Sequence, residues 1–418
     1  MKPSPWTVLT ALWAVAFITQ GVPNYGASVI NTAMAAEWGL DRSTLGLGFT
    51  LFVLTQGGTA PLVAWLSRRC GILATLLLGA CGMAAAAALL ALVGNQPWHY
   101  LLLFGVLLGS ACALAGGIPL QSCTAQWFEQ GRGLAMAMVM TASSVGGFVA
   151  APLLAAMMVA GGDWRIGWYA VAAAALFAAV IALLWVREPA AREHRQPGGA
   201  PLVKVRGVHR SEHDWSLRMA LATPAMWLSV ISAIAFNVVA FTLLAHLLPH
   251  LQGLGHPGAQ AAMALGCMSL AGVVGKLGAG YACDRFEPRA VWSVALLMCA
   301  AGVLLFLDAR GMAVAYLATF VVGLGGGASI VCWAALLANY YGARAFAGLM
   351  GLQMALMTPL AALSPFLAGL SFDHYGSYTP AFLAITALLV ISAFALLLAR
   401  PPRVPSDPAT EVSQRWVH

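Results

Sequence analysis

The sequence predicts an all-α integral membrane protein with twelve transmembrane helices, built as two six-helix halves. Composition is the first observation behind this prediction: 61% of the 418 residues are hydrophobic and only 8% are charged, whereas a soluble domain carries about 25% charged residues. The second is run length, because a helix needs about 20 mostly apolar residues to cross a bilayer. The third is continuity, since the strands of a membrane barrel are shorter and alternate between apolar and polar residues.

Twelve apolar runs of this kind follow one another along the chain. They are 6–30, 43–66, 71–93, 99–123, 132–160, 165–186, 219–250, 259–283, 290–307, 311–337, 345–371 and 378–400. The longest polar stretch, 187–218, is rich in Arg, His, Pro and Gly and separates six runs from six. We therefore expect an N-terminal six-helix bundle at 1–186, a cytoplasmic linker at 187–218, a C-terminal six-helix bundle at 219–400 and a disordered cytoplasmic tail at 401–418.

The basic residues predict the orientation of the spans. If the N-terminus is cytoplasmic, only Arg42, Arg165 and Arg310 among the 21 Lys and Arg residues fall on the outer side, and Lys276 falls within a span. The others fall on the cytoplasmic side, as the positive-inside rule requires. Both termini are therefore expected to be cytoplasmic. The net charge of +7 is explained by basic loops over anionic membrane lipids, so no nucleic-acid partner is expected.

Similar features recur in the two halves. Arg69 follows the second span as Arg285 follows the eighth, and GRGLAMAM at 131–138 opens the fifth span as GARAFAGL at 342–349 opens the eleventh. Two repeats related by an axis along the membrane normal are the layout of a known class of transporters.

Four stretches carry a resemblance to the major facilitator superfamily. GKLGAGYACDRF at 275–286 resembles the G-x-x-x-D-R motif that the family carries between spans 8 and 9, and PLVAWLSRRCGI at 61–72 is a degraded copy between spans 2 and 3. The stretches 37–62 and 126–153, together with GGDWRIGWYA at 161–170, resemble the monocarboxylate and oxalate–formate branch. The resemblance covers nearly the whole chain and implies a secondary transporter that works by rocker-switch alternating access.

The two copies of the motif also predict gating residues. The resemblance implies that Asp284 and Arg285 brace the cytoplasmic gate between spans 8 and 9, with Arg69 at the matching point of the first half. Arg132 and Arg344 are expected to brace the starts of spans 5 and 11. Arg68 stands where the family carries an acidic residue, so the lock in the first half is expected to be weak.

Lys276 is the one charged residue that lies deep in a predicted span. A charge at the bilayer centre costs about 3 kcal/mol or more, and eight residues of helix place Lys276 roughly 12 Å from Asp284 along the axis. None of the 14 acidic residues lies deep in a span. The resemblance implies that this position binds the carboxylate of the substrate, here through a point charge rather than a bidentate fork. The alternative is a lysine that snorkels to the headgroups or to Asp284.

Other polar residues within the spans are candidates for lining a substrate cavity. They are Asn24 and Tyr25, where Pro23 and Gly26 interrupt the first span, Gln121 in span 4, Asn237 in span 7, Trp333 in span 10 and Gln353 in span 11. Hydrogen bonding or packing between helices is the alternative role for each. His246, within span 7, is a candidate proton carrier or a residue bonded between helices, and Lys276 is a second candidate for proton coupling.

Several motifs are interpreted as structural. HRSEH at 209–213 matches a zinc-protease signature, but it lies in the polar linker and its occurrence there is expected by chance. The glycine runs at 143–148 and 323–329 lack the Gly-Lys-Ser/Thr ending of a phosphate-binding loop, which favours close helix packing. The eight cysteines contain no C-x-x-C pair and predict apolar packing. No cofactor, metal or catalytic residue is expected.

The sequence thus predicts a monomeric secondary transporter in a bacterial inner membrane. Its expected cargo is a small organic anion such as a monocarboxylate, moved with a proton or in exchange for a counter-substrate. The alternative is a permease or exporter of a larger amphipathic compound, such as a siderophore complex or a drug, because 14 tryptophans and 17 methionines could line a broad cavity. An intramembrane enzyme or a sensor is disfavoured, since neither a catalytic constellation nor an output domain is present.

Overall fold

Helices make up all of the regular structure in the computed structural model, which describes residues 4–40, 42–128, 131–188, 208–211, 213 and 215–402. The expected disorder of 401–418 and most of the linker 187–218 lie outside these residues.

The first half contains α1 Pro5–Ala16, η1 Phe17–Gly26, α2 Ala27–Trp38, α3 Arg42–Arg69, α4 Ile72–Leu92, α5 Pro97–Tyr100, η2 Leu101–Leu108, α6 Gly109–Leu114, α7 Gly117–Trp127, α8 Arg132–Gly161 and α9 Arg165–Trp185. The second contains α10 Leu217–Leu221, α11 Pro224–Gly253, α12 Gly258–Cys283, α13 Pro288–Phe306, α14 Met312–Tyr375 and α15 Thr379–Leu397.

Proline and glycine determine many of the helix boundaries. Pro5, Pro224 and Pro288 each occupy the first turn of a helix, where the missing N–H would have no intrahelical partner. At the other end, Gly39 and Gly162 adopt the left-handed conformation that closes α2 and α8, as expected of a glycine that follows the last helical turn.

The first span is continuous but locally widened. Helices α1, η1 and α2 run without a break, and η1 is π-helical and contains Pro23. Proline removes a backbone donor and displaces the preceding turn, and π-helical turns are frequent at functional sites. The predicted interruption near Pro23 is therefore a widened turn rather than a break.

Eleven of the described helical segments are long and apolar enough to cross a membrane, one fewer than predicted. The difference arises in α14, where 64 residues contain both predicted spans 311–337 and 345–371. The helix path breaks at Gly342, whose φ of 77° and ψ of 167° are non-helical. This region of backbone space is essentially restricted to glycine.

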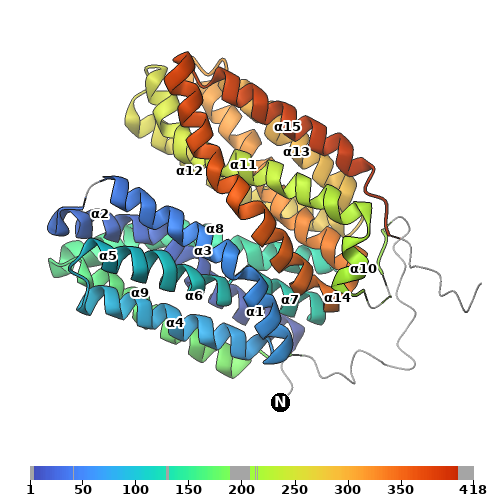
Figure 1. Ribbon diagram of the computed structural model, residues 1–418, viewed down its shortest axis with the longest axis horizontal. Helices are drawn as coiled ribbons and strands as arrows, with labels where there is room; N and C mark the ends of the chain where they lie inside the picture. Colours follow the sequence, from blue (N-terminus) through green and yellow to red (C-terminus); the bar gives the residue numbers. More distant parts are fainter. Residues whose placement is uncertain are drawn as a thin grey trace, which may run out of the picture.

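The helices form two bundles that approach each other at one end (Figure 1). Elements α1–α9 form one bundle and α11–α15 the other, and the two axes diverge from the end near α7 and α10 toward the end near α2 and α5. We call the first the linker end, because 187–218 joins the halves there, and the second the far end. The halves contact each other through α3 with α14 and α8 with α12. A Cβ on Gly133 of α8 would lie only 2.7 Å from the carbonyl oxygen of Gly280 of α12, so small residues permit this close approach.

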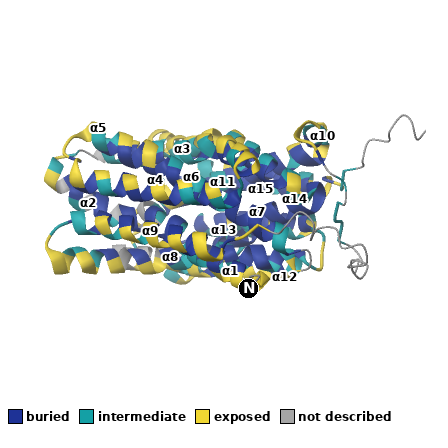
Figure 2. Cartoon of the chain, turned by 90° about the horizontal axis from the view of Figure 1, so that it is seen from below, coloured by how far each residue is buried: buried dark blue, intermediate teal, exposed yellow. Residues whose placement is uncertain are grey.

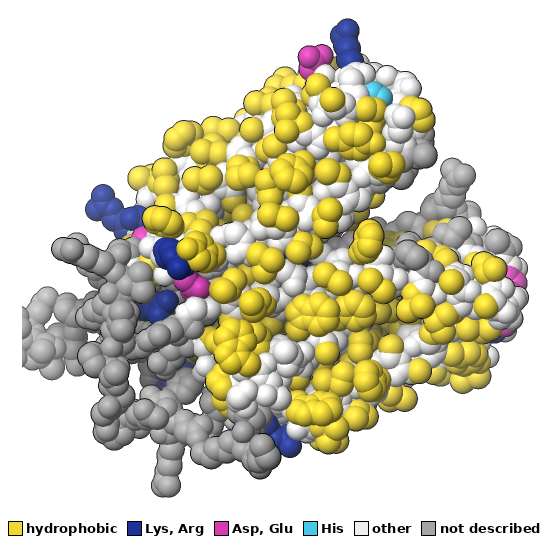
Figure 3. All heavy atoms as spheres, turned by 180° about the vertical axis from the view of Figure 1, so that it is seen from behind, with side chains coloured by type: hydrophobic (Ala, Val, Ile, Leu, Met, Phe, Trp, Pro, Cys, Tyr) yellow, Lys and Arg dark blue, Asp and Glu magenta, His cyan; other side chains and the backbone are white. Residues whose placement is uncertain are grey.

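The flanks of both bundles are apolar. Exposed residues follow the outer sides of the bundles while the interior is buried (Figure 2). Hydrophobic side chains cover the flanks, and Lys and Arg side chains lie toward the ends (Figure 3). Phe148 and Val159 are 81% and 84% exposed, which suits a surface surrounded by lipid rather than water. The protein is thus an all-helical, multi-pass membrane protein.

The backbone at Gly342 generates a prediction about stability. Replacing Gly342 with alanine forces a Cβ into a glycine-only conformation, at an expected cost of about 1–3 kcal/mol. The melting temperature of the detergent-purified variant should therefore fall below that of the wild type. Gly266→Ala is the matched control, because nothing lies within 4 Å of a Cβ at this helical position. Equal melting temperatures for both variants would show that a side chain at position 342 causes no backbone strain.

Candidate functional site

Lys276 connects the two halves. Its side chain is only 7% exposed, and its Nζ donates hydrogen bonds to the carbonyl oxygen of Met140 at 3.0 Å and to Oγ of Ser144 at 2.7 Å. Both acceptors belong to α8, whereas Lys276 belongs to α12. The side chain therefore crosses from one half to the other and does not extend toward Asp284.

The charge of Lys276 has no acidic partner in the described part of the chain. None of the ion pairs formed there involves this residue. An ammonium group has three donors, of which Met140 and Ser144 accept two. Burial of an ammonium is costly unless its protons are hydrogen-bonded and its charge is compensated. The structure supplies two of the hydrogen bonds, and no group of opposite charge pairs with the ammonium among the described residues.

A cluster of side-chain amides lies in the first half. Nε2 of Gln56 on α3 donates to Oδ1 of Asn24 at 3.3 Å, Nδ2 of Asn24 donates to the Gln20 carbonyl at 2.7 Å, and Nε2 of Gln20 donates to the Cys112 carbonyl at 2.9 Å. The two glutamines line a cavity of about 30 Å³ that Met354 of the other half closes. This volume is large enough for one or two water molecules.

Segment η1, which carries Gln20 and Asn24, and Lys276 lie at a similar height along α8. Gly146 of α8 packs against η1, because a Cβ on it would lie 2.6 Å from the Phe17 carbonyl oxygen. Ser144, which accepts from Lys276, precedes Gly146 by two residues, a rise of about 3 Å along α8. Segment η1 and Lys276 contact different sides of α8, because residues two apart in a helix point about 200° apart. Of the amide cluster, sequence analysis identified only Asn24. Gln20 and Gln56 were missed, although a glutamine within an apolar span is the same kind of signal as Asn24.

The remaining predicted cavity residues lie in different environments. Trp333 donates its indole N–H to Oε1 of Gln353, whose Nε2 donates to Oγ of Ser229 at 2.6 Å. This network is buried within the second half. Asn237 donates to the Ala233 carbonyl at 2.8 Å and faces Sδ of Met357 at 3.3 Å.

Gln121 is the predicted cavity residue with the fewest hydrogen bonds among the described side chains. Gln121 is 3% exposed, and its Oε1 has no hydrogen-bond partner among the described residues. Gln121 lies beside Gly117, because a Cβ on Gly117 would be 3.4 Å from Nε2 of Gln121. Gly117 in turn lines the small cavity. The side chain of Tyr25 lies outside the described part of the chain, and its backbone belongs to η1.

His246 joins three helices of the second half near the far end. Its Nδ1 lies 3.0 Å from the Tyr378 hydroxyl and its Nε2 lies 2.8 Å from the Pro365 carbonyl oxygen. With a proton on Nε2, the ring donates to Pro365 and accepts from Tyr378, so a neutral imidazole satisfies both contacts. The structure does not bring His246 into contact with Lys276 or the amide cluster.

The predicted gate residues occupy the linker end, but they do not act alike. Asp284 accepts hydrogen bonds from the backbone N–H groups of Gly133 at 2.9 Å and Leu134 at 3.1 Å. These are donors at the N-terminus of α8, where the helix dipole favours an anion. Arg132 also crosses between the halves, donating from Nη1 to the Ala338 carbonyl at 3.2 Å.

The other three arginines lie on the exposed surface. The Arg285 guanidinium lies 3.5 Å from the centroid of the Tyr281 ring, and Arg69 lies 5.8 Å from that of Trp65. Arg344 begins the segment of α14 that follows Gly342 and is exposed. Arg285 therefore does not share the contacts of Asp284 with α8.

Arg68 makes the corresponding site of the first half different. A Cβ on Gly348 of α14 would lie 2.6 Å from Nη1 of Arg68, so the guanidinium abuts the second half where the family carries a carboxylate. A cation near the start of a helix is disfavoured by the dipole. This contact therefore lacks the electrostatic attraction that Asp284 provides.

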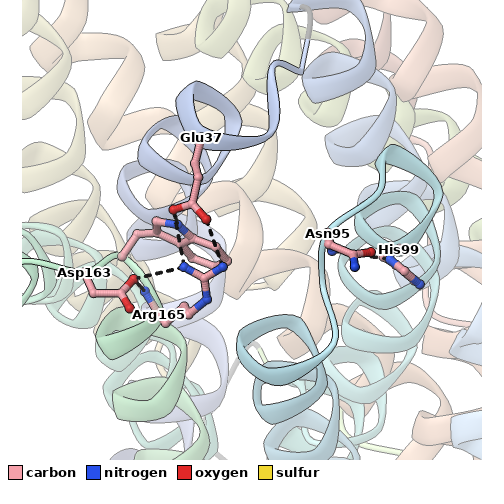
Figure 4. Close-up of polar contacts among 6 residues, drawn as sticks. Glu37, Asn95, His99, Asp163 and Arg165 are labelled. Atoms are coloured by element: carbon pink, nitrogen blue, oxygen red, sulfur yellow. Dashed lines mark hydrogen bonds and ion pairs between the residues drawn. The ribbon is translucent and has the colours of Figure 1, made fainter.

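An ion pair closes the far end of the first half (Figure 4). Nη2 of Arg165 lies 2.9 Å from Oε1 of Glu37, and Nη1 lies 3.5 Å from Oδ1 of Asp163. Trp164 donates its indole N–H to Glu37 as well. The Arg165 hydrogen bond holds the pKa of Glu37 below its usual value of 4.5. Helix α2 is thereby tied to the start of α9.

Known proteins resemble the chain along nearly its whole length. The family model of the Major Facilitator Superfamily matches residues 12–307 and 233–416. Monocarboxylate transporter 13 of Rattus norvegicus is 25% identical over 398 residues, which cover 93% of this chain and 87% of that protein. The 2-nitroimidazole transporter of Escherichia coli (strain K12) is 26% identical over 394 residues, covering 91% and 92%. The crystal structure of the transporter FucP in the outward conformation matches with a TM-score of 0.71 at 14% identity, covering 94% and 99%.

The contact of Asp284 with α8 leads to a prediction about the linker end. Asp284→Asn removes the charge from two charge-assisted hydrogen bonds, and should lower the free energy of unfolding by about 1–3 kcal/mol. Hydrogen exchange of the Gly133 and Leu134 amides should accelerate, as measured by mass spectrometry of a peptide that contains them. Asp308→Asn is the control, because Asp308 is 89% exposed and lies 3.9 Å from Arg310. Unchanged exchange in Asp284→Asn would contradict the assigned contact.

The pKa of Glu37 leads to a prediction about acid stability. A carboxyl group whose pKa is lowered on folding contributes stability that is present above its unfolded pKa of about 4.5 and is lost as the pH falls through the lowered folded value. The melting temperature of the wild type should therefore fall more steeply below pH 4.5 than that of Glu37→Gln. Parallel pH profiles would rule out this contribution.

Proposed function

Because the chain belongs to the major facilitator superfamily and is a transporter rather than an enzyme, we propose that it moves a small organic anion, such as a monocarboxylate, across the membrane. Transport would occur by rocker-switch alternating access, together with a proton or in exchange for a second anion. The observation that carries this proposal is Lys276, a buried ammonium between the two halves without an acidic partner among the described residues.

We further propose that the chain crosses the membrane twelve times, with α14 supplying two of the spans, one before and one after Gly342. The linker end is then cytoplasmic, as are both termini, and the domains are the two bundles predicted at 1–186 and 219–400. A monomer in a bacterial inner membrane fits this arrangement. The contacts of Asp284, Arg132 and Lys276, which join the halves at or toward the linker end, support a state closed on the cytoplasmic side under this proposal.

We place the site between Lys276 and the amide cluster, because η1 and Lys276 contact α8 at a similar height. The anion would bind the ammonium of Lys276 through its third donor or in place of Ser144, while Gln20, Asn24 and Gln56 would bind neutral polar groups of the cargo. Binding in place of Ser144 would loosen a bond between the halves and so favour their rocking. A proton carried with the anion, or a second anion in exchange, would keep the charge of the site balanced.

A second candidate cargo is a larger amphipathic or aromatic compound, such as a siderophore complex or a drug. Two observations favour it. A relative of similar identity is a 2-nitroimidazole transporter, and the partners of Lys276 are neutral groups that could hold the lysine in a structural role. In this case the amide cluster, rather than the ammonium, would carry most of the recognition.

Ligand-induced thermal shifts distinguish the two candidates. The purified protein is heated with a panel of monocarboxylates, dicarboxylates, siderophores and aromatic drugs, and uptake of any stabilising compound is then measured in proteoliposomes. We expect a monocarboxylate to stabilise the wild type. Because a charge-assisted hydrogen bond contributes about 1.5–3 kcal/mol, Lys276→Gln should weaken its binding roughly 10- to 150-fold.

Lys276→Arg is the matched variant, because it keeps the charge while changing the geometry. It should retain part of the anion-dependent shift, and both variants should be folded in the absence of ligand. Retention of full anion affinity by Lys276→Gln would exclude the anchoring role. A thermal shift with a neutral aromatic compound that survives Lys276→Gln would favour the second cargo.

A further inference from the structure

An apolar groove runs along the outer flank of the second half. It has a volume of about 520 Å³ and lies between α12, α13 and α14. Glycine and alanine, among them Gly275, Ala279 and Ala295, form part of its lining. Val274 and Val294, which also line it, are 54% and 58% exposed, and a Cβ on Gly278 would meet nothing within 4 Å. The described part of the chain therefore leaves this groove open to the surrounding lipid.

The length of the groove matches one leaflet of the membrane. Its lining extends along α12 from Val274 to Ala282 and continues to Phe286 beyond the helix end. Nine residues of helix from Val274 to Cys283 rise about 14 Å, close to the ~15 Å of hydrocarbon in one leaflet. The groove thus reaches from the middle of the membrane to its surface at the linker end, as an acyl chain does.

One arginine lies beside the end of the groove. Arg285 stands in sequence between the lining residues Ala282 and Phe286, and its guanidinium lies 3.5 Å from the centroid of the Tyr281 ring. Arg289 faces away from the groove, because it donates from Nη1 to the Leu397 carbonyl of α15 at 3.0 Å. Neither arginine takes part in an ion pair within the described residues.

The acidic neighbours of these arginines are bonded elsewhere. Asp284 accepts from two amides of α8 in the other half. Glu287 accepts from the backbone N–H of His209 and from the Tyr340 hydroxyl at 3.2 Å. Arg285 is therefore left without an acidic partner among the described residues, although the segment 284–289 contains as many acidic as basic residues.

We propose that this groove is a binding site for an anionic phospholipid, with one acyl chain in the groove and the phosphate on Arg285. Arginine is well suited to this role because its planar fork binds phosphate through two parallel hydrogen bonds. The cytoplasmic leaflet is rich in such lipids. The bound lipid lies on the flank of α12 that faces away from α8, so the helix that carries Lys276 and Asp284 is held between a lipid and the other half.

The test compares lipid-dependent stability of the full-length protein in detergent. Phosphatidylglycerol and phosphatidylcholine with identical chains are titrated separately, and the melting temperature is recorded. Phosphatidylglycerol should stabilise the wild type more than phosphatidylcholine, since a ligand that binds only the folded state raises its stability. This difference should disappear in Arg285→Gln, and Gly278→Leu, which fills the groove, should reduce the shift by phosphatidylglycerol.

Arg69→Gln is the matched control. Arg69 also lies at the linker end over an aromatic residue four positions earlier, but it lies outside the groove, so the variant should keep the full preference for phosphatidylglycerol. An equal loss in Arg69→Gln would indicate a general effect of charge and overturn the proposal. So would equal shifts by the two lipids in the wild type.

Photo-crosslinking of the wild type provides a measurement that does not depend on a folded variant. Phosphatidylglycerol with a diazirine in its acyl chain should label peptides from 274–298 in preference to the equivalent surface of the first half. Competition by unlabelled phosphatidylglycerol, but not by phosphatidylcholine, should remove this labelling. Uniform labelling of both halves would also overturn the proposal.

Discussion

A charged group inside a membrane protein must be hydrogen-bonded within the protein, because the hydrocarbon around it offers no partner. In this chain the constraint falls on Lys276, and α8 of the opposite half meets it with the Met140 carbonyl and the Ser144 hydroxyl. The same pair of helices is joined again by Asp284 and the first amides of α8. The contact between α8 and α12 therefore depends on polar groups that have few other partners within reach.

Helix α12 has a different neighbour on each side. Toward α8 it presents Lys276, Gly280 and Asp284. Toward α14 it packs through Gly275, where a Cβ would lie 2.1 Å from the Leu324 carbonyl oxygen. Its remaining flank lines the open groove. Small residues on two sides let the helix approach its neighbours closely. A shift of α12 would therefore change its contacts with α8, its contacts with α14 and the shape of the groove together.

The two halves have similar helix arrangements, but each contributes different side chains to the contacts between them. Asp284 places a carboxylate at the start of α8, whereas Arg68 places a guanidinium against Gly348 of α14. Opposite charges at equivalent helix starts have opposite effects on the dipole. Asp284 of the second half thus bonds the start of α8 at the linker end, and Arg132 of the first half donates to the Ala338 carbonyl, while α3 and α14 pack closely at Ala60 and Gly351.

The sequence alone determined that the chain is a multi-pass helical membrane protein, because the length of an apolar run directly reflects the thickness of a bilayer. It also identified Lys276 and Asp284, since a charge in or beside such a run is conspicuous. It could not say which side of each helix faces the other half. Most of these helices are apolar all round, so no amphipathic stripe marks a buried face. Only the packed structure therefore decided that Lys276 bonds to Ser144, that Gln20 and Gln56 join Asn24, and that Trp333 and Gln353 pair within the second half, because those contacts depend on how each helix is rotated against its neighbours.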